Sequence, residues 1–328
     1  MPTQNIVHQD KLLTNVSVAF AQQPSAFVAG RVFPNIPVSK QSDKYLIVDR
    51  DSMNRDEMKP RAAGTESAGG SFTYSDDSYF CDVFGLHKDI DDQTAANEDD
   101  IFELQTNTTQ WLTTKSLIKK EKLFVSSYFQ AGVWSTDITG IGGAGVLGTS
   151  VKQWNDAAST PIEDVRYYTT AQQLLTGYRP NVMVMGQQVW DALIDHPDVI
   201  DRIKYGTTDD NVAIANQRTV ARLFELDEIL VMSSVENTAN EGIAEANAFI
   251  GGKGALLCYR TSTPGRRVAT AGYTFNWTGL NGAYGKMGTT IDRFRMEHLK
   301  SERIEIEMAF DQKVVSADMG TFFATVVA

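Results

Sequence analysis

The chain has 328 residues, of which 42% are hydrophobic, so it can bury one large core or two modest ones. Its 41 acidic and 30 basic residues leave a net charge of -11, which excludes a protein whose whole surface coats DNA, because such a surface needs basic patches. Two cysteines, Cys81 and Cys258, form no spacing motif and indicate a reducing compartment. The first residues lack a signal-peptide pattern, and no stretch approaches the roughly 18 apolar residues of a membrane span.

Small and polar residues dominate positions 1–41, and prolines at 24, 34 and 37 interrupt them. Each proline removes a backbone donor and restricts the residue before it, which disfavours a long helix. Scattered apolar residues such as Phe20 and Phe27 predict an arm that lies on a surface. That surface is either the core of the same chain or a neighbouring molecule, and composition does not separate the two.

A long two-stranded excursion is predicted over residues 42–88. Strand-forming residues at 44–49 and alternating aromatic residues at 71–85 flank a polar, glycine-rich tip at 50–70. Because an isolated ribbon is marginal in water, we expect another subunit to cover its apolar face. The alternative is a hairpin flattened on its own domain. The tip residues expected at an inter-subunit contact are Asp56, Glu57, Lys59 and Arg61.

One long amphipathic helix is predicted over residues 97–131. Asn97 would be its N-cap, and acids at 98–100 would favour the positive end of the helix dipole. Gly132 is the expected stop. The predicted apolar stripe repeats at intervals of seven and consists of Leu104, Trp111, Ile118 and Val125, extended by Ile101 and Phe129. At ~1.5 Å per residue the helix would span about 50 Å, and we expect it to pack on a sheet.

From residue 161 onward, short apolar strands alternate with helices, which predicts an α/β unit over residues 161–285. Residues 303–311 alternate strictly between charged and apolar, as a strand with one buried face would. The residues predicted to face inward are Ile304, Ile306, Met308 and Phe310. The sequence therefore predicts an α+β protein with the second domain inserted between the long helix and the strands that complete the first.

No catalytic, cofactor-binding or metal site is predicted. Residues 140–145 match the dinucleotide pattern G-x-G-x-x-G, but this motif needs a preceding buried strand, whereas a helix end and the polar stretch 135–137 come first. We therefore predict a flexible, glycine-dense linker over residues 140–148. The four histidines are far apart in the sequence, and the acidic pairs lack the ligand series of a calcium loop.

Five short segments carry recognisable packing patterns: Pro180–Gly186, Val189–Leu193, His196–Val199, Arg202–Gly206 and Phe310–Val315. They resemble the major capsid proteins of tailed bacteriophages. The order of the parts is also similar, so the resemblance covers nearly the whole chain in layout. In specific residues it covers much less, and those residues are packing patterns rather than catalytic signatures.

The resemblance implies the Hong Kong 97-like capsid fold. Residues 1–41 would be the N-terminal arm and 42–88 the extended β-hairpin loop. Residues 89–160 and 286–328 would form a peripheral domain around the spine helix at 97–131, and residues 161–285 an inserted α/β axial domain. The implied function is that of a major head protein, a structural and non-enzymatic component of the virion.

The same resemblance implies the partners. Copies of the chain would form the hexamers and pentamers of an icosahedral shell, which encloses double-stranded DNA without sequence-specific binding and without a membrane. Assembly would occur in the host cytoplasm. Because no helical scaffolding segment is visible at the N-terminus, the resemblance implies a separate scaffolding protein or a trimmed chain. A portal and decoration proteins are further implied partners. The alternatives are an encapsulin-like compartment with protein cargo and a two-domain α/β enzyme that uses the loop at 140–148 for phosphate.

Overall fold

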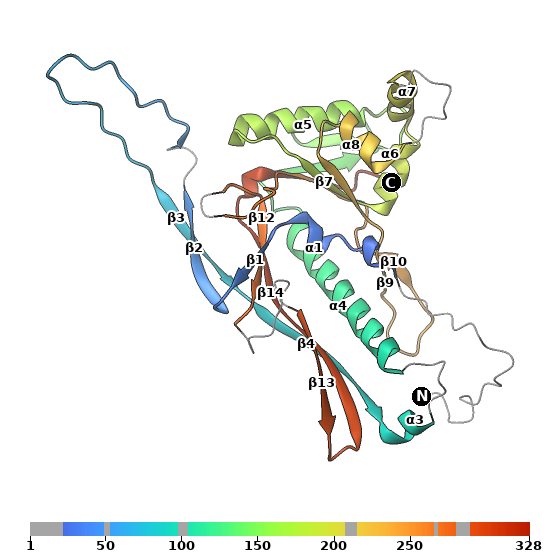
Figure 1. Cartoon of the computed structure of the whole chain (residues 1–328). Helices are drawn as coiled ribbons and strands as arrows, with labels where there is room; N and C mark the ends of the chain where they lie inside the picture. Colours follow the sequence, from blue (N-terminus) through green and yellow to red (C-terminus); the bar gives the residue numbers. More distant parts are fainter. Residues whose placement is uncertain (1–21, 49–52, 98–103, 207–214, 266–267, 280–288) are drawn as a thin grey trace.

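The computed structural model describes residues 22–48, 53–97, 104–206, 215–265, 268–279 and 289–328. Two sheets form the body of the molecule, a long helix α4 runs beside both, and a hairpin projects away from them (Figure 1). No helix among the described residues is both long and apolar enough to cross a bilayer.

The larger sheet has six strands in the order β6-β5-β15-β11-β7-β8. Its strands are β5 (Thr136–Ile141), β6 (Ser150–Lys152), β7 (Val182–Gly186), β8 (Glu228–Met232), β11 (Ala255–Cys258) and β15 (Gly320–Ala324). The helices on one face are α5 (Pro161–Thr176), α6 (Gln187–Ile194), α7 (Pro197–Gly206) and α8 (Gln217–Leu223). Every residue of β7 is buried, because both faces of this sheet are covered.

The two faces of the six-stranded sheet belong to two different cores. Met183 and Met185 point toward α5–α8, whereas Val182 and Val184 point toward α1 (Ala29–Val32) and the end of α4. This split follows from the two-residue period of a strand. The predicted α/β unit is thus present.

The second sheet carries the strands predicted near the C-terminus. It is built from β1 (Asn35–Val38), β4 (Asp82–Asp91), β12 (Gly272–Trp277), β13 (Thr289–Met296) and β14 (Ser301–Val314). β14 is the central strand and pairs antiparallel with β4, β12 and β13. The four residues predicted to face inward are buried, namely Ile304, Ile306, Met308 and Phe310, and Ala309 between the last two is buried as well.

The start of the long helix lies outside the described residues. Asn97, the predicted N-cap, is the C-cap of the short helix α3 (Asp92–Ala96). The side chain of Asp91 accepts a hydrogen bond from the backbone N–H of Thr94 at 2.9 Å and so caps α3 instead. The described part of α4 runs from Leu104 to Tyr128, and the acids at 98–100 lie outside the described residues.

The apolar stripe predicted for α4 is also wrong in phase. Trp111 remains 42% exposed, while its neighbour Leu112 is fully buried. The buried positions are Thr108, Leu112, Ser116, Glu121, Phe124 and Tyr128. Small hydroxyl residues at 108 and 116 bring the first half of the helix close to β14 and β4, and aromatic residues at 124 and 128 pack under the six-stranded sheet. Of the predicted stripe, Trp111 lies about 100° away from Leu112 around the helix. Leu104 and Val125 are partly buried, and Phe129, just after α4, is buried as predicted.

The strand pairing crosses the predicted domain boundaries. β5 and β6 precede residue 160, yet they share a sheet with β7 and β8. β12 precedes residue 285, yet it pairs with β14. A boundary at 160 or 285 therefore cuts through a sheet, because the chain returns to each sheet more than once. The named peripheral and axial domains stay a prediction.

The described part of the N-terminal segment packs on its own chain. Val28, Ala29, Val32 and Phe33 are buried against α4 and the larger sheet, after the short 3-10 helix η2 (Pro24–Ala26). β1 then pairs parallel with β12. For these residues the own-core alternative holds, and positions 1–21 lie outside the described residues. The remaining small elements are β9 (Val235–Asn237), β10 (Asn247–Phe249) and the 3-10 helix η3 (Ala317–Met319).

Candidate functional site

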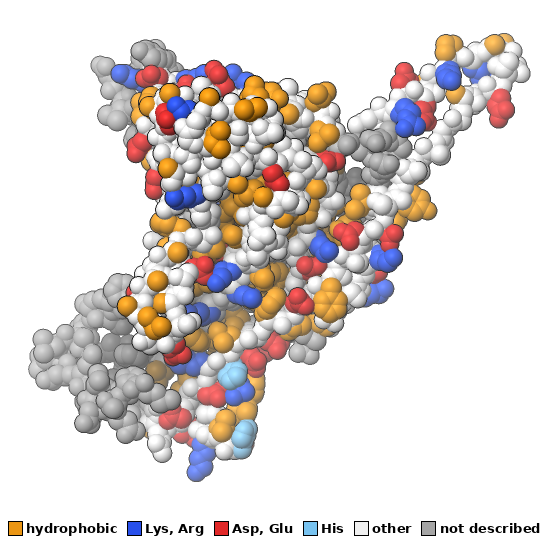
Figure 2. Space-filling view, turned by 180° about the vertical axis from the view of Figure 1, so that it is seen from behind, with side chains coloured by type: hydrophobic (Ala, Val, Ile, Leu, Met, Phe, Trp, Pro, Cys, Tyr) orange, Lys and Arg blue, Asp and Glu red, His pale blue; other side chains and the backbone are white. Residues whose placement is uncertain are grey.

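The predicted hairpin is present and stands away from the body. β2 (Ser42–Val48) and β3 (Tyr74–Phe80) pair antiparallel from Ser42 opposite Phe80 to Val48 opposite Tyr74. At its base the Tyr79 ring stacks on Phe275 with ring centroids 4.5 Å apart. Beyond the strands the tip extends into solvent, and Figure 2 shows it separated from the rest of the surface. The base is thus anchored on the chain's own core, and the tip is not.

One face of the hairpin leaves large apolar side chains uncovered. Leu46, Tyr74 and Phe80 are 69%, 67% and 55% exposed, and the register places all three on the same face. The opposite face turns Tyr45 and Tyr79 toward Phe275. Covering each exposed side chain would contribute about 1.5–3 kcal/mol. This face is therefore a candidate surface for another molecule.

The four predicted tip residues lie in the exposed tip, and their contacts with described residues are to nearby tip residues. Asp56 accepts a hydrogen bond from the backbone N–H of Met58 at 3.2 Å, and Arg61 donates to the carbonyl oxygen of Thr65. Glu57 lies 3.8 Å from Arg55. Lys59 forms no ion pair among the described residues. A role for Asp56, Glu57, Lys59 and Arg61 at an inter-subunit contact stays a prediction.

Arginine–carboxylate pairs join the strands next to the hairpin. Arg303 on β14 donates to both oxygens of Asp89 on β4, at 2.7 and 2.8 Å, and Arg295 on β13 donates to both oxygens of Asp92 at 2.5 and 2.6 Å. The side-chain hydrogen bonds from these arginines lower the pKa of Asp89 and of Asp92. Two-point pairs of this kind fix the orientation of the strands as well as their spacing.

A buried carboxylate fixes the N-terminal segment to α4. Glu121 is fully buried and accepts hydrogen bonds from the backbone N–H groups of Val28, at 3.0 and 3.1 Å, and Ala29, at 2.8 Å. It therefore caps α1 from another element, since Val28 supplies no capping side chain. Burial raises the pKa of Glu121. The hydrogen bonds from Val28 and Ala29 act in the opposite direction.

The other end of α1 is held by a cation. Arg260 donates to the carbonyl oxygen of Arg31 at 2.5 Å and to Glu228 at 2.6 Å, and Arg31 also pairs with Glu228 at 2.7 Å. An anion at the first turn and a cation at the last turn both complement the helix dipole. The clamp of Glu121 and Arg260 was not predicted from the sequence. The sequence did contain a signal for Glu121, because it is the only acidic residue in the described, lysine-rich part of α4.

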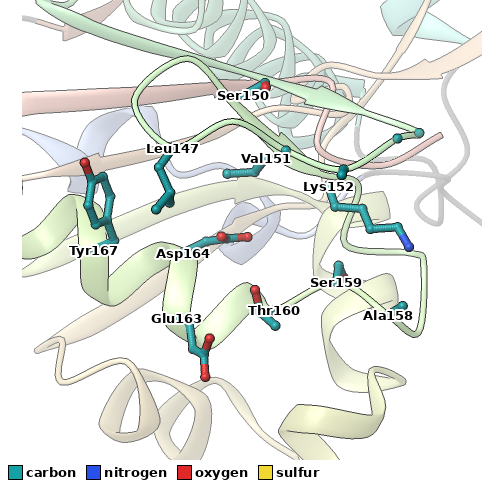
Figure 3. Close-up of a pocket in the computed structure, with 14 residues that line it drawn as sticks. Leu147, Ser150, Val151, Lys152, Ala158, Ser159, Thr160, Glu163, Asp164 and Tyr167 are labelled. Carbon is teal, nitrogen blue, oxygen red and sulfur yellow. The ribbon is translucent and has the colours of Figure 1, made fainter.

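The glycine-rich loop borders a cavity of about 700 Å³ (Figure 3). The cavity lies between the loop and the first turns of α5, and Leu147, Lys152, Asp164 and Tyr167 line it. Asp164 accepts a hydrogen bond from the indole Nε1 of Trp154 at 3.2 Å, and burial raises the pKa of its carboxyl group.

The loop is not a dinucleotide motif, although the reason differs from the one predicted. The strand β5 does precede it, which corrects the expectation of a helix end and a polar stretch. However, the chain continues into β6 rather than into a helix, so no helix N-terminus follows the glycines to bind a pyrophosphate.

A serine–histidine pair beside the cavity is arranged for structure rather than for nucleophilic attack. The Nδ1 of His196 accepts the backbone N–H of Asp198 at 3.2 Å, so the proton resides on Nε2. That Nε2–H points to Ser159 Oγ at 3.0 Å and to the carbonyl of Asp156 at 3.2 Å. The hydroxyl of Ser159 in turn donates to the backbone carbonyl oxygen of Asp156 at 2.7 Å. A protonated nitrogen cannot take the serine proton, so this pair lacks a general base.

The described residues hold no cluster of three or more side chains that could bind a metal ion. Cys81 and Cys258 are both buried and free. Burial raises the pKa of each thiol to about 12. Neither thiol is therefore an activated nucleophile.

Comparisons with known proteins support one family. The family "Phage major capsid protein E" matches residues 148–280. A major capsid protein of Pseudomonas phage JBD67 is 22% identical over 95% of this chain and 96% of its own length. The crystal structure of a phage-related protein from Bordetella bronchiseptica superposes with a TM-score of 0.69 at 17% identity, covering 93% of both chains.

Shell proteins of assembled particles share the fold. The mature capsid of bacteriophage PhiM1 gives a TM-score of 0.59 at 10% identity, covering 97% of this chain and 91% of that one. The encapsulin SrpI of Synechococcus elongatus gives 0.55 at 11% identity, covering 97% and 95%. The sequence relatives at full length come from phages and carry the name major capsid protein. The predicted resemblance to phage major capsid proteins is confirmed, and the fold of the chain is that of phage capsid proteins.

Proposed function

We propose that copies of this chain assemble into the icosahedral shell that encloses the double-stranded DNA genome of a tailed phage. The observation that carries this proposal is the hairpin, which is anchored at its base by Tyr79 on Phe275 and exposes Leu46, Tyr74 and Phe80 along one face. A single chain leaves this face in water, and a second copy supplies apolar surface to cover it. Symmetric repetition then turns many weak contacts into a stable wall.

The remaining parts of the proposal concern partners and place. The shell is a component of the virion, built from pentamers and hexamers of the chain and assembled in the host cytoplasm. A separate scaffolding protein guides the curvature, a portal occupies one vertex, and decoration proteins bind outside. The chain acts as a structural protein and not as an enzyme, which agrees with the protonated Nε2 of His196 and with the inert thiols.

The test is electron microscopy and sedimentation of the purified full-length protein, with the scaffolding protein co-expressed where the chain alone does not close. Closed, uniform shells with nucleic acid inside particles from infected cells are expected. Shells that hold a protein cargo and no nucleic acid would instead favour an encapsulin-like compartment. A rigid monomer at every concentration would contradict both functions.

A further inference from the structure

One exposed strip beside α4 concentrates positive charge in a chain whose net charge is -11. We define the lysine strip as Lys88 on β4 with Trp111, Lys115 and Lys119 on α4. The Nζ atoms of Lys88 and Lys115 lie 6.0 and 5.9 Å from the centre of the Trp111 ring. Lys119 lies over the ring of Phe84 at 5.1 Å. Within the described residues none of the three lysines has a carboxylate partner, so their charge is directed to solvent.

The rest of the exposed α4 surface carries no negative charge. The one acid between Leu104 and Tyr128 is Glu121, which is fully buried under α1. Apart from Lys122, which pairs with Glu236, the other exposed side chains are amides and hydroxyls, including Gln105, Thr106 and Gln110. Lysine, amide and hydroxyl groups are those that proteins use to contact the DNA backbone. At ~1.5 Å per residue the described helix is about 37 Å long, close to one turn of a DNA duplex.

The opposite side of the same layer is acidic. In the antiparallel register, Asp292 on β13 lies opposite Glu305 on β14, and neighbouring strand residues alternate between faces. Asp292, Glu305 and Glu307 therefore lie on the face turned away from the buried row Ile304, Ile306 and Met308 that packs toward α4. The layer formed by α4 and the strands β4, β13 and β14 therefore has one basic side and one acidic side.

We propose that the lysine strip contacts the phosphate backbone of the enclosed double-stranded DNA, without reading its sequence, and that the acidic sheet face points away from the genome. The inference rests on the proposed function, since it requires a shell that encloses DNA. Three phosphate contacts per copy bind weakly, with a salt dependence of log affinity near -2.7, so the duplex can still move along the wall.

The strip differs from a surface built for another copy of the chain. Protein interfaces are depleted of lysine in their centre and enriched in aromatic residues. The exposed hairpin face follows that rule with Leu46, Tyr74 and Phe80. At the lysine strip two apolar side chains, Trp111 and Leu86, are 42% and 40% exposed beside three lysines. Phosphate is the better complement to this arrangement.

The first test measures binding of unassembled full-length protein to a labelled duplex of about 24 base pairs at several salt concentrations. The variant replaces Lys88, Lys115 and Lys119 with glutamine. Its matched control replaces three exposed lysines elsewhere, Lys59, Lys204 and Lys253, so that the net charge changes equally. The strip variant should bind at least about tenfold more weakly, with its salt slope reduced by about one per lysine, and the control should bind like the wild type. An equal loss in both variants, or no loss in either, overturns the proposal.

The second test uses the fluorescence of Trp111, whose lysine neighbours attract iodide as a quencher. Subtracting the signal of Trp111→Phe isolates this residue from the other four tryptophans. Iodide should reach Trp111 in empty shells and be excluded in DNA-filled shells. Equal protection in both kinds of shell would mean that another protein segment covers the strip, and the inference would fail while the proposed function stood. A wild type that forms no shells at all would count against the proposed function instead.

Discussion

The six-stranded sheet and the projecting hairpin differ in how much of their apolar surface the chain itself covers. Both are β-structure with apolar side chains on their faces. The sheet has its faces covered within the chain, by α5–α8 on one side and by α1 and α4 on the other, so β7 is buried at every residue. The hairpin is covered on one face at its base, and its other face keeps Leu46 at 69% and Tyr74 at 67% exposure.

The difference shows where the chain is self-sufficient. A protein that needed only to fold would shelter both regions, because a free two-stranded ribbon gains little stability in water. Here one region stabilises the subunit, and in the proposed shell the other is available for contacts between subunits. Substitutions should therefore separate into those that change folding and those that change assembly.

The largest effect is expected from deleting residues 54–68, which removes the tip and leaves the strands β2 and β3. The subunit should fold with a nearly unchanged thermal midpoint, because the tip makes no contact with the described core. Closed shells should be absent by electron microscopy. Normal shells from this deletion would refute the role assigned to the hairpin.

A large effect on folding is expected for Glu121→Ala, which leaves the buried N–H groups of Val28 and Ala29 without an acceptor. The free energy of unfolding should fall by about 2–3 kcal/mol, measured by denaturant titration. Glu163→Ala, at an exposed position, is the matched control and should stay within about 0.5 kcal/mol of the wild type. Equal losses in the two variants would show that Glu121 is not an anchor.

A smaller effect is expected from acid. The pKa of Asp89 is lowered by Arg303, and that of Asp92 by Arg295, so the folded state holds these groups ionised more firmly than the unfolded chain does. The stability from both pairs is present above the ordinary pKa near ~4 and is lost as pH falls through the lower folded value. The thermal midpoint of the wild type should drop over this acid range, and that of Asp89→Asn should drop less. Parallel curves for the two proteins would exclude the contribution of Asp89.

The smallest effect is expected from reversing the charge of Asp56 and Glu57 with lysine. Both side chains are partly or fully exposed, so folding should not change. If the tip contacts a neighbour, assembly should weaken a few-fold at low salt and recover toward the wild type as salt screens the charges. Sedimentation at low and high ionic strength measures this. Identical profiles at both salt concentrations would place the tip outside any charged contact.

Much of the architecture followed from patterns in the sequence. The alternation at 303–311 and the polar tip between two strands are local signals, and β14 and β2 lie close to where they were predicted. The strand predicted over 71–85 instead divides into β3 and β4, which join different sheets. The short apolar strands between helices indicated the α/β unit for the same reason. Such patterns succeed because side-chain periodicity alone decides which face of an element is buried.

The errors have a common cause in long-range packing. The seven-residue spacing predicted that Trp111 faces the core. Leu112 is buried instead, because the two halves of the helix pack on two different sheets. Asn97 looked like an N-cap, but the capping aspartate at 91 begins a separate short helix. The clamp on α1 joins Val28, Glu121 and Arg260 from three distant segments, and no local pattern records that contact.

Because α4 spans both sheets, a small tilt at one end moves the other end by a larger distance. Its last turn is fixed under the six-stranded sheet by Phe124 and Tyr128, and its middle rests on β14 and β4 through Leu112. Over a length of about 37 Å, a tilt of ~5° displaces the free end by roughly 3 Å. In the proposed shell, a pivot of this size would let identical copies adopt slightly different contact angles while each core stays intact.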